Sequence, residues 1–150
     1  MSRRRSRGGI ASATDAAGYF GGVETSLPTS GTASYAGSAT AIEVRNDKTA
    51  QGLYTGTMTA SVDFRARTLA GSMDLANAAQ GSNLVIETGQ MKLNSTTGRF
   101  AGANFTSSAG HAGFGDGRFF GPEQNEIGGA FNITNDQSTV VGGFGAAKVE

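Results

Sequence analysis

Cysteine and tryptophan are absent from this sequence, and histidine occurs once, at His111. Without cysteine the chain has no disulfide, no cysteine-based metal site and no thiol to accept a lipid anchor. A single histidine, without cysteine or a clear pair of carboxylates, leaves no catalytic Ser-His-Asp constellation to assign. The sequence therefore predicts a protein that is not an enzyme.

Long apolar runs and helical periodicity are missing as well. No segment is long enough for a transmembrane helix, and no apolar run of a secretion signal follows the first basic residues. Hydrophobic residues make up only 37% of the 150 residues, and glycine occurs 24 times. This composition favours one domain of strands, turns and bends around a thin core.

Acidic and basic residues balance to a net charge of zero, but four of the 12 basic residues are arginines within the first seven positions, at Arg3, Arg4, Arg5 and Arg7. The rest of the chain is therefore acidic, which does not suit nucleic acid binding by the folded body. The arginines fit a solvated tail, or a tail that touches nucleic acid or anionic lipid. We expect residues 1–30 to form a flexible tail or linker and residues 31–150 to form the folded domain.

Beyond residue 31, apolar and polar side chains alternate, as they do in half-buried strands. Residues 54–64 are the clearest case, with Tyr54 and Phe64 on one face and threonine or serine on most of the other. Residues 69–75 repeat the alternation, and the short link between the two segments predicts a hairpin.

Two segments are interpreted as changing phase. In residues 84–93 the apolar positions change from even to odd at Gly89, which predicts a β-bulge. In residues 34–44 the apolar set is read as passing from Tyr35 and Gly37 to Ile42 and Val44, which predicts a similar irregularity.

Turn signals separate further strands at residues 99–104, 117–120, 127–134 and 139–148, with an additional short strand at residues 105–107. About eight antiparallel strands result, and such a sheet hides its apolar face and its edges by closing into a barrel. The apolar faces carry glycine and alanine and aromatic residues are only 8%, so the barrel is not expected to span a membrane. Four large residues each precede a glycine by two positions, which predicts that large side chains fill the space beside neighbouring glycines: Tyr35 and Gly37, Tyr54 and Gly56, Leu69 and Gly71, Phe100 and Gly102.

Residues 113–131 read GFGDGRFFGPEQNEIGGAF, which predicts two glycine-rich strands around a polar corner with one helical turn. The signature consists of Gly117, Phe119, Phe120, Gly121, Pro122, Glu126, Gly128, Gly129 and Phe131, followed by Val141, Phe144, Gly145, Ala146 and Lys148. With Tyr54-x-Gly56, Val62-Asp63-Phe64, Leu69-x-Gly71 and Phe100-x-Gly102 upstream, it resembles the C-terminal barrel of transferrin-binding-protein-like surface lipoproteins.

The resemblance implies an eight-stranded, lipocalin-like barrel from a Gram-negative bacterium, displayed on the cell surface or released. It implies binding of a protein or of haem-related cargo through loops and an accessory domain. Export signal, lipid-acceptor cysteine and accessory domain are not found in this chain, and Gln124 and Asn125 depart from the usual corner. Transferrin itself is accordingly not the expected partner.

Ligand contacts are expected from the loop at residues 107–116, where Gly113–Gly117 is read as mobile. The candidate ligand-binding residues are His111, Phe114, Asp116 and Arg118. His111 is either an axial ligand for haem iron or a solvated side chain, and no other cofactor or metal is expected. The alternative function is that of a structural subunit, docked in an assembly through the barrel exterior and the N-terminal tail, and the oligomeric state stays open.

Overall fold

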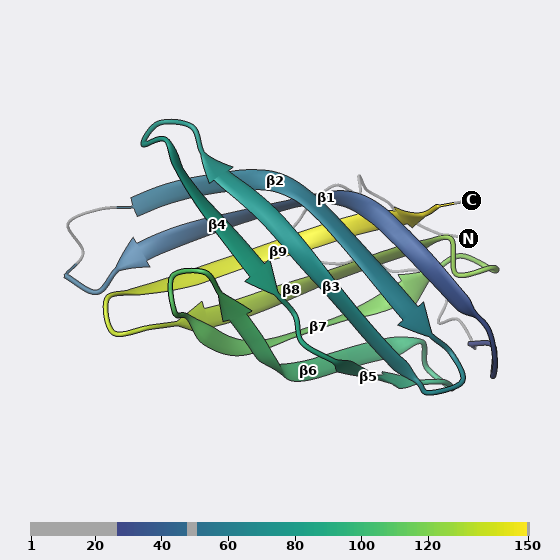
Figure 1. The fold of residues 1–150 in the computed structure, drawn as a ribbon. Coiled ribbons are helices and arrows are strands. Elements are labelled where there is room, and N and C mark those ends of the chain that lie inside the picture. Colours follow the sequence, from purple (N-terminus) through teal and green to yellow (C-terminus); the bar gives the residue numbers. More distant parts are fainter. Residues whose placement is uncertain (1–26, 48–50, 150) are drawn as a thin grey trace, which may run out of the picture.

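A computed structural model describes residues 27–47 and 51–149, and within them it contains strands and turns but no helix. The strands are β1 (Thr32–Arg45), β2 (Gln51–Asp63), β3 (Thr68–Asn77), β4 (Ser82–Glu87), β5 (Met91–Asn94), β6 (Arg99–Ser107), β7 (Ala112–Phe120), β8 (Glu126–Thr134) and β9 (Ser138–Lys148) (Figure 1). The expected tail falls mostly outside the described residues. Of its last four residues, Leu27 is buried in the core, and its N–H donates to the carbonyl of Ser95 (3.0 Å).

The strands form one closed antiparallel barrel. Consecutive strands pair with each other except for β4 and β5, which together fill one place between β3 and β6, and β1 also pairs with β9. The prediction of an eight-stranded barrel is therefore confirmed, and Figure 1 shows β2 and β3 crossing in front of β8 and β9. The connections β1–β2, β3–β4, β6–β7 and β8–β9 lie at one end, which we call the loop end.

The break between β4 and β5 is the phase change predicted at Gly89. The N–H of Thr88 donates to the carbonyl of Gly71 (3.0 Å), while the Thr88 hydroxyl accepts the Gly71 N–H (2.8 Å). Gly89 adopts a left-handed φ of 64°, which glycine tolerates without steric cost. The strand thus resumes in the opposite phase, and the four apolar residues that define the phase change are all buried: Leu84, Ile86, Met91 and Leu93.

The phase change predicted in β1 is wrong. Tyr35, Ala39 and Ala41 are all buried, whereas Ile42 is 46% exposed and Val44 is 38% exposed. The inward odd-numbered face therefore continues without a bulge. The polar residue Glu43 can occupy an inward position because its carboxylate has hydrogen-bond partners there.

Residues 113–117 belong to strand β7 and are not the predicted loop, and the corner at residues 121–125 is a turn without a helical turn. The inward glycines of this region leave room for rings from the adjacent strands. A Cβ on Gly117 would lie 2.7 Å from the ring of Phe100, and one on Gly115 would lie 2.4 Å from the ring of Phe105. The predicted filling of glycine gaps is therefore present, but the rings lie over glycines other than those named from the sequence.

Aromatic side chains fill much of the interior. The ring of Phe119 lies 5.5 Å from Phe100, 5.9 Å from Tyr35 and 5.9 Å from Phe64, measured between centroids. Nearer the loop end, Phe131 stacks on Phe105 at 6.1 Å. Phe131 is 3% exposed, which confirms its predicted place inside the barrel.

Candidate functional site

The four predicted ligand-binding residues do not converge on one site. His111 lies just before β7 and is buried, with 2% of its surface exposed, so the solvated interpretation is wrong. Phe114, Asp116 and Arg118 alternate with the inward glycines of β7 and lie on the outer face of the barrel. Phe114 is 61% exposed, while Arg118 is 9% exposed and places its guanidinium carbon 5.8 Å from the centre of the Phe120 ring.

Inside the loop end, a buried polar cluster surrounds the histidine. Nδ1 of His111 lies 2.7 Å from the hydroxyl of Ser107, and Nε2 lies 2.7 Å from the hydroxyl of Ser138. Ser138 donates to a carboxylate oxygen of Glu43 at 2.6 Å. The other oxygen of Glu43 accepts from the hydroxyl of Tyr54 at 3.3 Å. We call Ser107, His111, Ser138 and Glu43 the His111 cluster.

Hydrogen-bond accounting fixes the tautomer of His111. A hydroxyl has one proton to donate and two lone pairs to accept with. The Ser107 oxygen accepts the N–H groups of Ala109 and His111 (3.1 Å each), so its proton points to Nδ1. Nδ1 is therefore the acceptor, and Nε2 carries the ring proton and donates to Ser138.

This proton arrangement argues against a catalytic serine. In a hydrolase the histidine accepts the serine proton, whereas here Nε2 of His111 donates to Ser138 and the Ser138 proton goes to Glu43. Ser138 is also buried, with 1% exposure. The cluster instead ties β1, the β6–β7 connection and the start of β9 together.

Burial lowers the pKa of His111, and the carboxylate of Glu43, 3.9 Å from Nε2, opposes that shift by favouring the charged ring. Both ring nitrogens are engaged in hydrogen bonds. Haem ligation by His111 stays a prediction, and it would require one of these two bonds to break.

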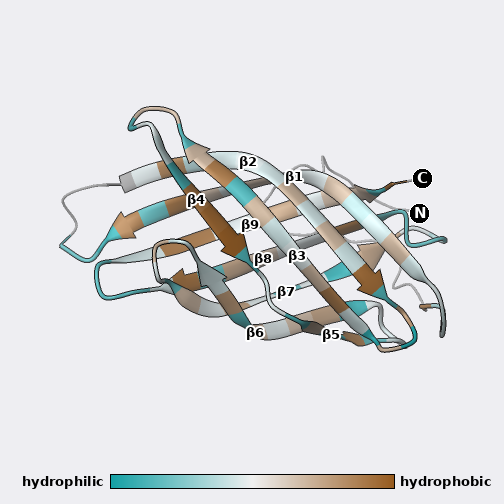
Figure 2. Cartoon of the chain, viewed as in Figure 1, coloured by the Kyte–Doolittle hydropathy of each residue, from teal (hydrophilic) through white to brown (hydrophobic). Residues whose placement is uncertain are grey.

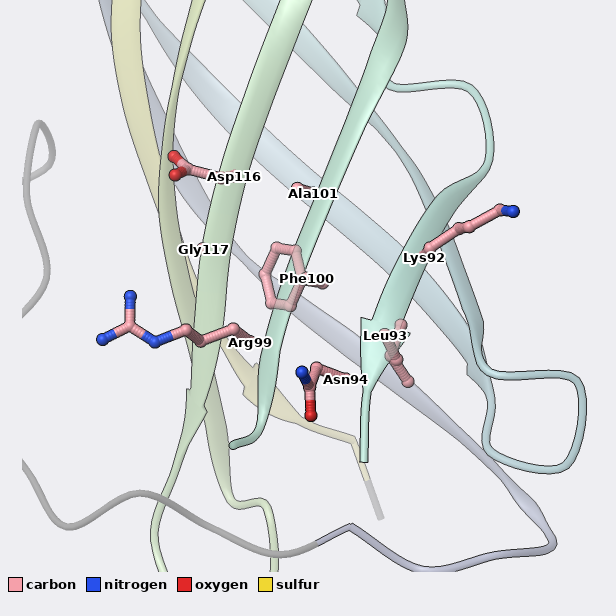
Figure 3. A pocket seen from close by; sticks show the side chains of 8 residues that line it. All are labelled: Lys92, Leu93, Asn94, Arg99, Phe100, Ala101, Asp116 and Gly117. Atoms are coloured by element: carbon pink, nitrogen blue, oxygen red, sulfur yellow. The ribbon is translucent and has the colours of Figure 1, made fainter. Parts of the chain in front are cut away.

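A depression of about 300 Å³ is lined by residues of β5, β6 and β7, and it includes Asp116. Its other charged residues, Lys92 on β5 and Arg99 on β6, were not predicted, because their proximity depends on strand register. Figure 3 shows the Lys92 and Arg99 side chains pointing to opposite sides of the depression. The two basic groups therefore do not converge on a single bound group.

The described residues contain no group of three or more His, Asp or Glu side chains placed to hold a metal ion. No helix in this part of the chain is long and apolar enough to cross a membrane.

Residues 27–148 match the family of C-lobe and N-lobe β-barrels of Tf-binding protein B. The chain belongs to this family. The family match spans most of the chain, from buried Leu27 to the end of β9, and it confirms the resemblance given by the signature residues.

Solved structures of this family share the barrel fold. Intact Ap-TbpB with its N and C lobes has a TM-score of 0.62 at 21% identity, over 83% of this chain and 28% of that one. A TbpB double mutant from Haemophilus parasuis, described as a vaccine antigen, has a TM-score of 0.64 at 22% identity, over 82% of this chain and 26% of that one. A structure titled surface lipoprotein has a TM-score of 0.56 at 18% identity, over 86% of this chain and 66% of that one. This chain thus spans about a quarter of the length of the two TbpB structures. A search of curated proteins returned no match.

In the barrel of this chain, several signature residues have structural roles. Phe144 lies over Gly129, where a Cβ would be 2.6 Å from its ring. Gly121 has a left-handed φ of 91° at the corner, where the Tyr35 hydroxyl donates to the carbonyl of Gln124 at 2.7 Å. The remaining signature residues are distributed over the wall: Tyr54, Phe64, Phe131 and Gly128 are buried, Gly56, Gly71 and Phe120 are half-buried, and Pro122 and Glu126 are exposed.

Proposed function

We propose that this chain is a non-enzymatic binding module, exposed at the cell surface, that recognises a protein through the loop end of its barrel. The observation that carries the proposal is that the inside of the barrel is occupied by aromatic rings and by the His111 cluster. A partner is therefore expected to bind on the outside. The family supports a protein partner, because its solved members are named for binding transferrin, and one similar structure is titled a surface lipoprotein.

The loop end is suited to recognition because its connections are tied to one another. The backbone N–H of Asn46 donates to the carbonyl of Gln137 at 2.8 Å, and its side-chain amide donates to the carbonyl of Asp136 at 2.9 Å. The side-chain amide of Asn135 donates to the carbonyl of Ala109 at 3.0 Å. Asn46 and the β6–β7 and β8–β9 connections thus form one pre-ordered polar rim, which lowers the entropy cost of binding.

The experiment is a binding screen with the full chain immobilised and with transferrin, haem and proteins from the natural surroundings of the source cell as analytes. We expect retention of a protein, and weaker retention by Asn46→Ala and Asn135→Ala, which remove ties within the rim. Thr59→Ala, exposed on the outer face of β2 away from the loop end, is the control. Equal binding by all variants would contradict recognition by the loop end. Turnover of a substrate that is lost on a point substitution would contradict the non-enzymatic assignment.

A further inference from the structure

Apolar side chains gather on one part of the outer wall. Among the described residues six large hydrophobic side chains are exposed, at Ile42, Val44, Leu53, Phe114, Val141 and Val149. Strand register places four of them in one row across five strands. Leu53 lies opposite Ile42, and Ile42 lies opposite Val141. Asn132 on β8 lies between Val141 and Phe114, because it pairs with Val141 on one side and with Phe114 on the other.

The middle of this row belongs to a wall without charge. We define the neutral wall as the outward positions of β2, β1, β9 and β8 in four successive rows. The first row consists of Val44, Thr139 and Thr134, and the second of Leu53, Ile42, Val141 and Asn132. The third row consists of Thr55, Thr40, Gly143 and Ala130, and the fourth of Thr57, Ser38, Gly145 and Gly128. In Figure 2 the middle of β1 and β2 is close to white, the colour between the two extremes.

The rest of the outer surface has a different chemistry. Outward charged residues lie on β3 to β7, including Asp74, Glu87, Lys92, Arg99 and Asp116. Protein surfaces usually carry charged residues of both signs. Charged residues are depleted in the core of protein–protein interfaces. The neutral wall with its apolar row therefore shares with an interface core the absence of charged side chains.

We propose that the neutral wall is the face through which two copies of this chain associate. A two-fold dimer brings the same surface patch of both copies together, so a charged patch would meet its own charge. The neutral wall has no charge to repel. Its threonine, serine and alanine side chains are short and its glycines carry no side chain, so two walls can approach closely. Ile42, at the centre of its row between Leu53 and Val141, supplies the apolar contact.

The size of the wall fits this occupant. Four strands at about 4.8 Å spacing and four rows at about 6.8 Å spacing cover roughly 500 Å². A standard interface buries about 800 Å² per partner, so the wall supplies the core of such an interface, and its margin, including Phe114, supplies the rim. The loop ends of both copies stay free, and the dimer does not depend on the proposed protein recognition.

The test is sedimentation velocity on the full chain over a wide concentration range, at low and at high salt. We expect a concentration-dependent dimer that persists at high salt, because its core contains no ion pair. A protein that stays monomeric at every concentration overturns the proposal. A dimer that dissociates on addition of salt also overturns it, because the N-terminal arginines would then account for association.

Substitutions locate the interface. Ile42→Lys with Val141→Lys, and separately Leu53→Glu, place charge on exposed positions of the wall, and circular dichroism verifies that each variant folds. We expect loss of the dimer at concentrations at which the unmodified chain is dimeric. Ala70→Lys, exposed on the outer face of β3, is the matched control and should leave the dimer unchanged. A dimer that survives in both wall variants overturns the proposal.

Discussion

The hydroxyl of Ser107 donates a hydrogen bond to Nδ1 of His111 and thereby holds the only histidine of the chain as a neutral ring. Protonation of Nδ1 would direct an N–H at an oxygen whose lone pairs already accept two backbone N–H groups. The desolvation that lowers the pKa of His111 and the hydrogen bonding of the ring act in the same direction. The loop end is therefore built around an uncharged imidazole.

Stability should consequently fall on mild acidification. The unfolded chain takes up a proton at a histidine pKa of about 6.5, whereas the folded chain takes it up only at lower pH. The free energy of unfolding is expected to decrease as pH falls below about 6.5, by about 1.4 kcal/mol for each unit by which the pKa is lowered. Urea unfolding at a series of pH values measures this dependence.

His111→Gln is the control for the acid response, because glutamine stays neutral over the same range. Its unfolding free energy should be nearly constant where that of the unmodified chain declines. The Hε1 resonance of the single histidine gives an independent readout by NMR titration. A midpoint at or above 6.5 would show that the ring is not held neutral.

Tyr35 is expected to make the stability of the fold depend on pH in the alkaline range. Burial raises the pKa of its phenol to about 12, and the hydroxyl donates to the carbonyl of Gln124. Because the pKa of Tyr35 is higher in the folded chain than in the unfolded chain, the protonated phenol stabilises the fold. This stabilisation is complete below about pH 10 and is lost as pH rises toward the pKa of the folded chain. Tyr35→Phe should remove the part of the alkaline destabilisation due to this group. At neutral pH it should cost about 1 to 2 kcal/mol, because the Gln124 carbonyl loses its donor. An unchanged stability of the variant at pH 7 would contradict the hydrogen bond.

Local alternation in the sequence was enough to predict most of the strands and the closed barrel, whereas the first half of β7 was predicted to be a loop. The phase change at Gly89 was also predictable, because the apolar residues before and after Gly89 in the sequence indicate which positions face inward. β1 was misread because Ile42 and Val44 were assumed to be buried, although Tyr35, Ala39, Ala41 and Glu43 keep one parity. An inward, half-buried carboxylate such as that of Glu43 is recognised only when its partners are known, and its partner Ser138 lies 95 residues away.

The His111 cluster and the neutral wall could not be derived from one sequence for the same reason. Both depend on register between distant strands, and a shift by one residue would exchange the inner and outer faces. The row from Leu53 to Phe114 combines four separate pairings. Ligand binding by Phe114 and Asp116 stays a prediction, and the outward direction of their side chains follows only from β7 being a strand.

Phe131 tests the packing near the loop end. Phe131→Ala removes a ring that stacks on Phe105 and lies over Gly142, so we expect a loss of about 3 to 5 kcal/mol in unfolding free energy. Phe114→Ala removes the same ring from an outward position with 61% exposure and should change stability by less than about 0.5 kcal/mol. A loss below about 1 kcal/mol for Phe131→Ala would show that its face is misassigned.

Gly129 tests the close approach of a ring and a neighbouring strand. A Cβ at this position would lie 2.3 Å from the carbonyl oxygen of Asp116 and 2.6 Å from the ring of Phe144. Gly129→Ala should therefore cost about 1 to 3 kcal/mol, and Phe144→Leu in the same chain should not restore stability, because the backbone clash remains. Gly145→Ala is the matched control on the adjacent strand, since its Cβ would meet no atom closer than 3.9 Å. Chemical denaturation of the three variants decides the matter. Equal stabilities for Gly129→Ala and Gly145→Ala would mean that β7 and β8 are not packed as closely as described.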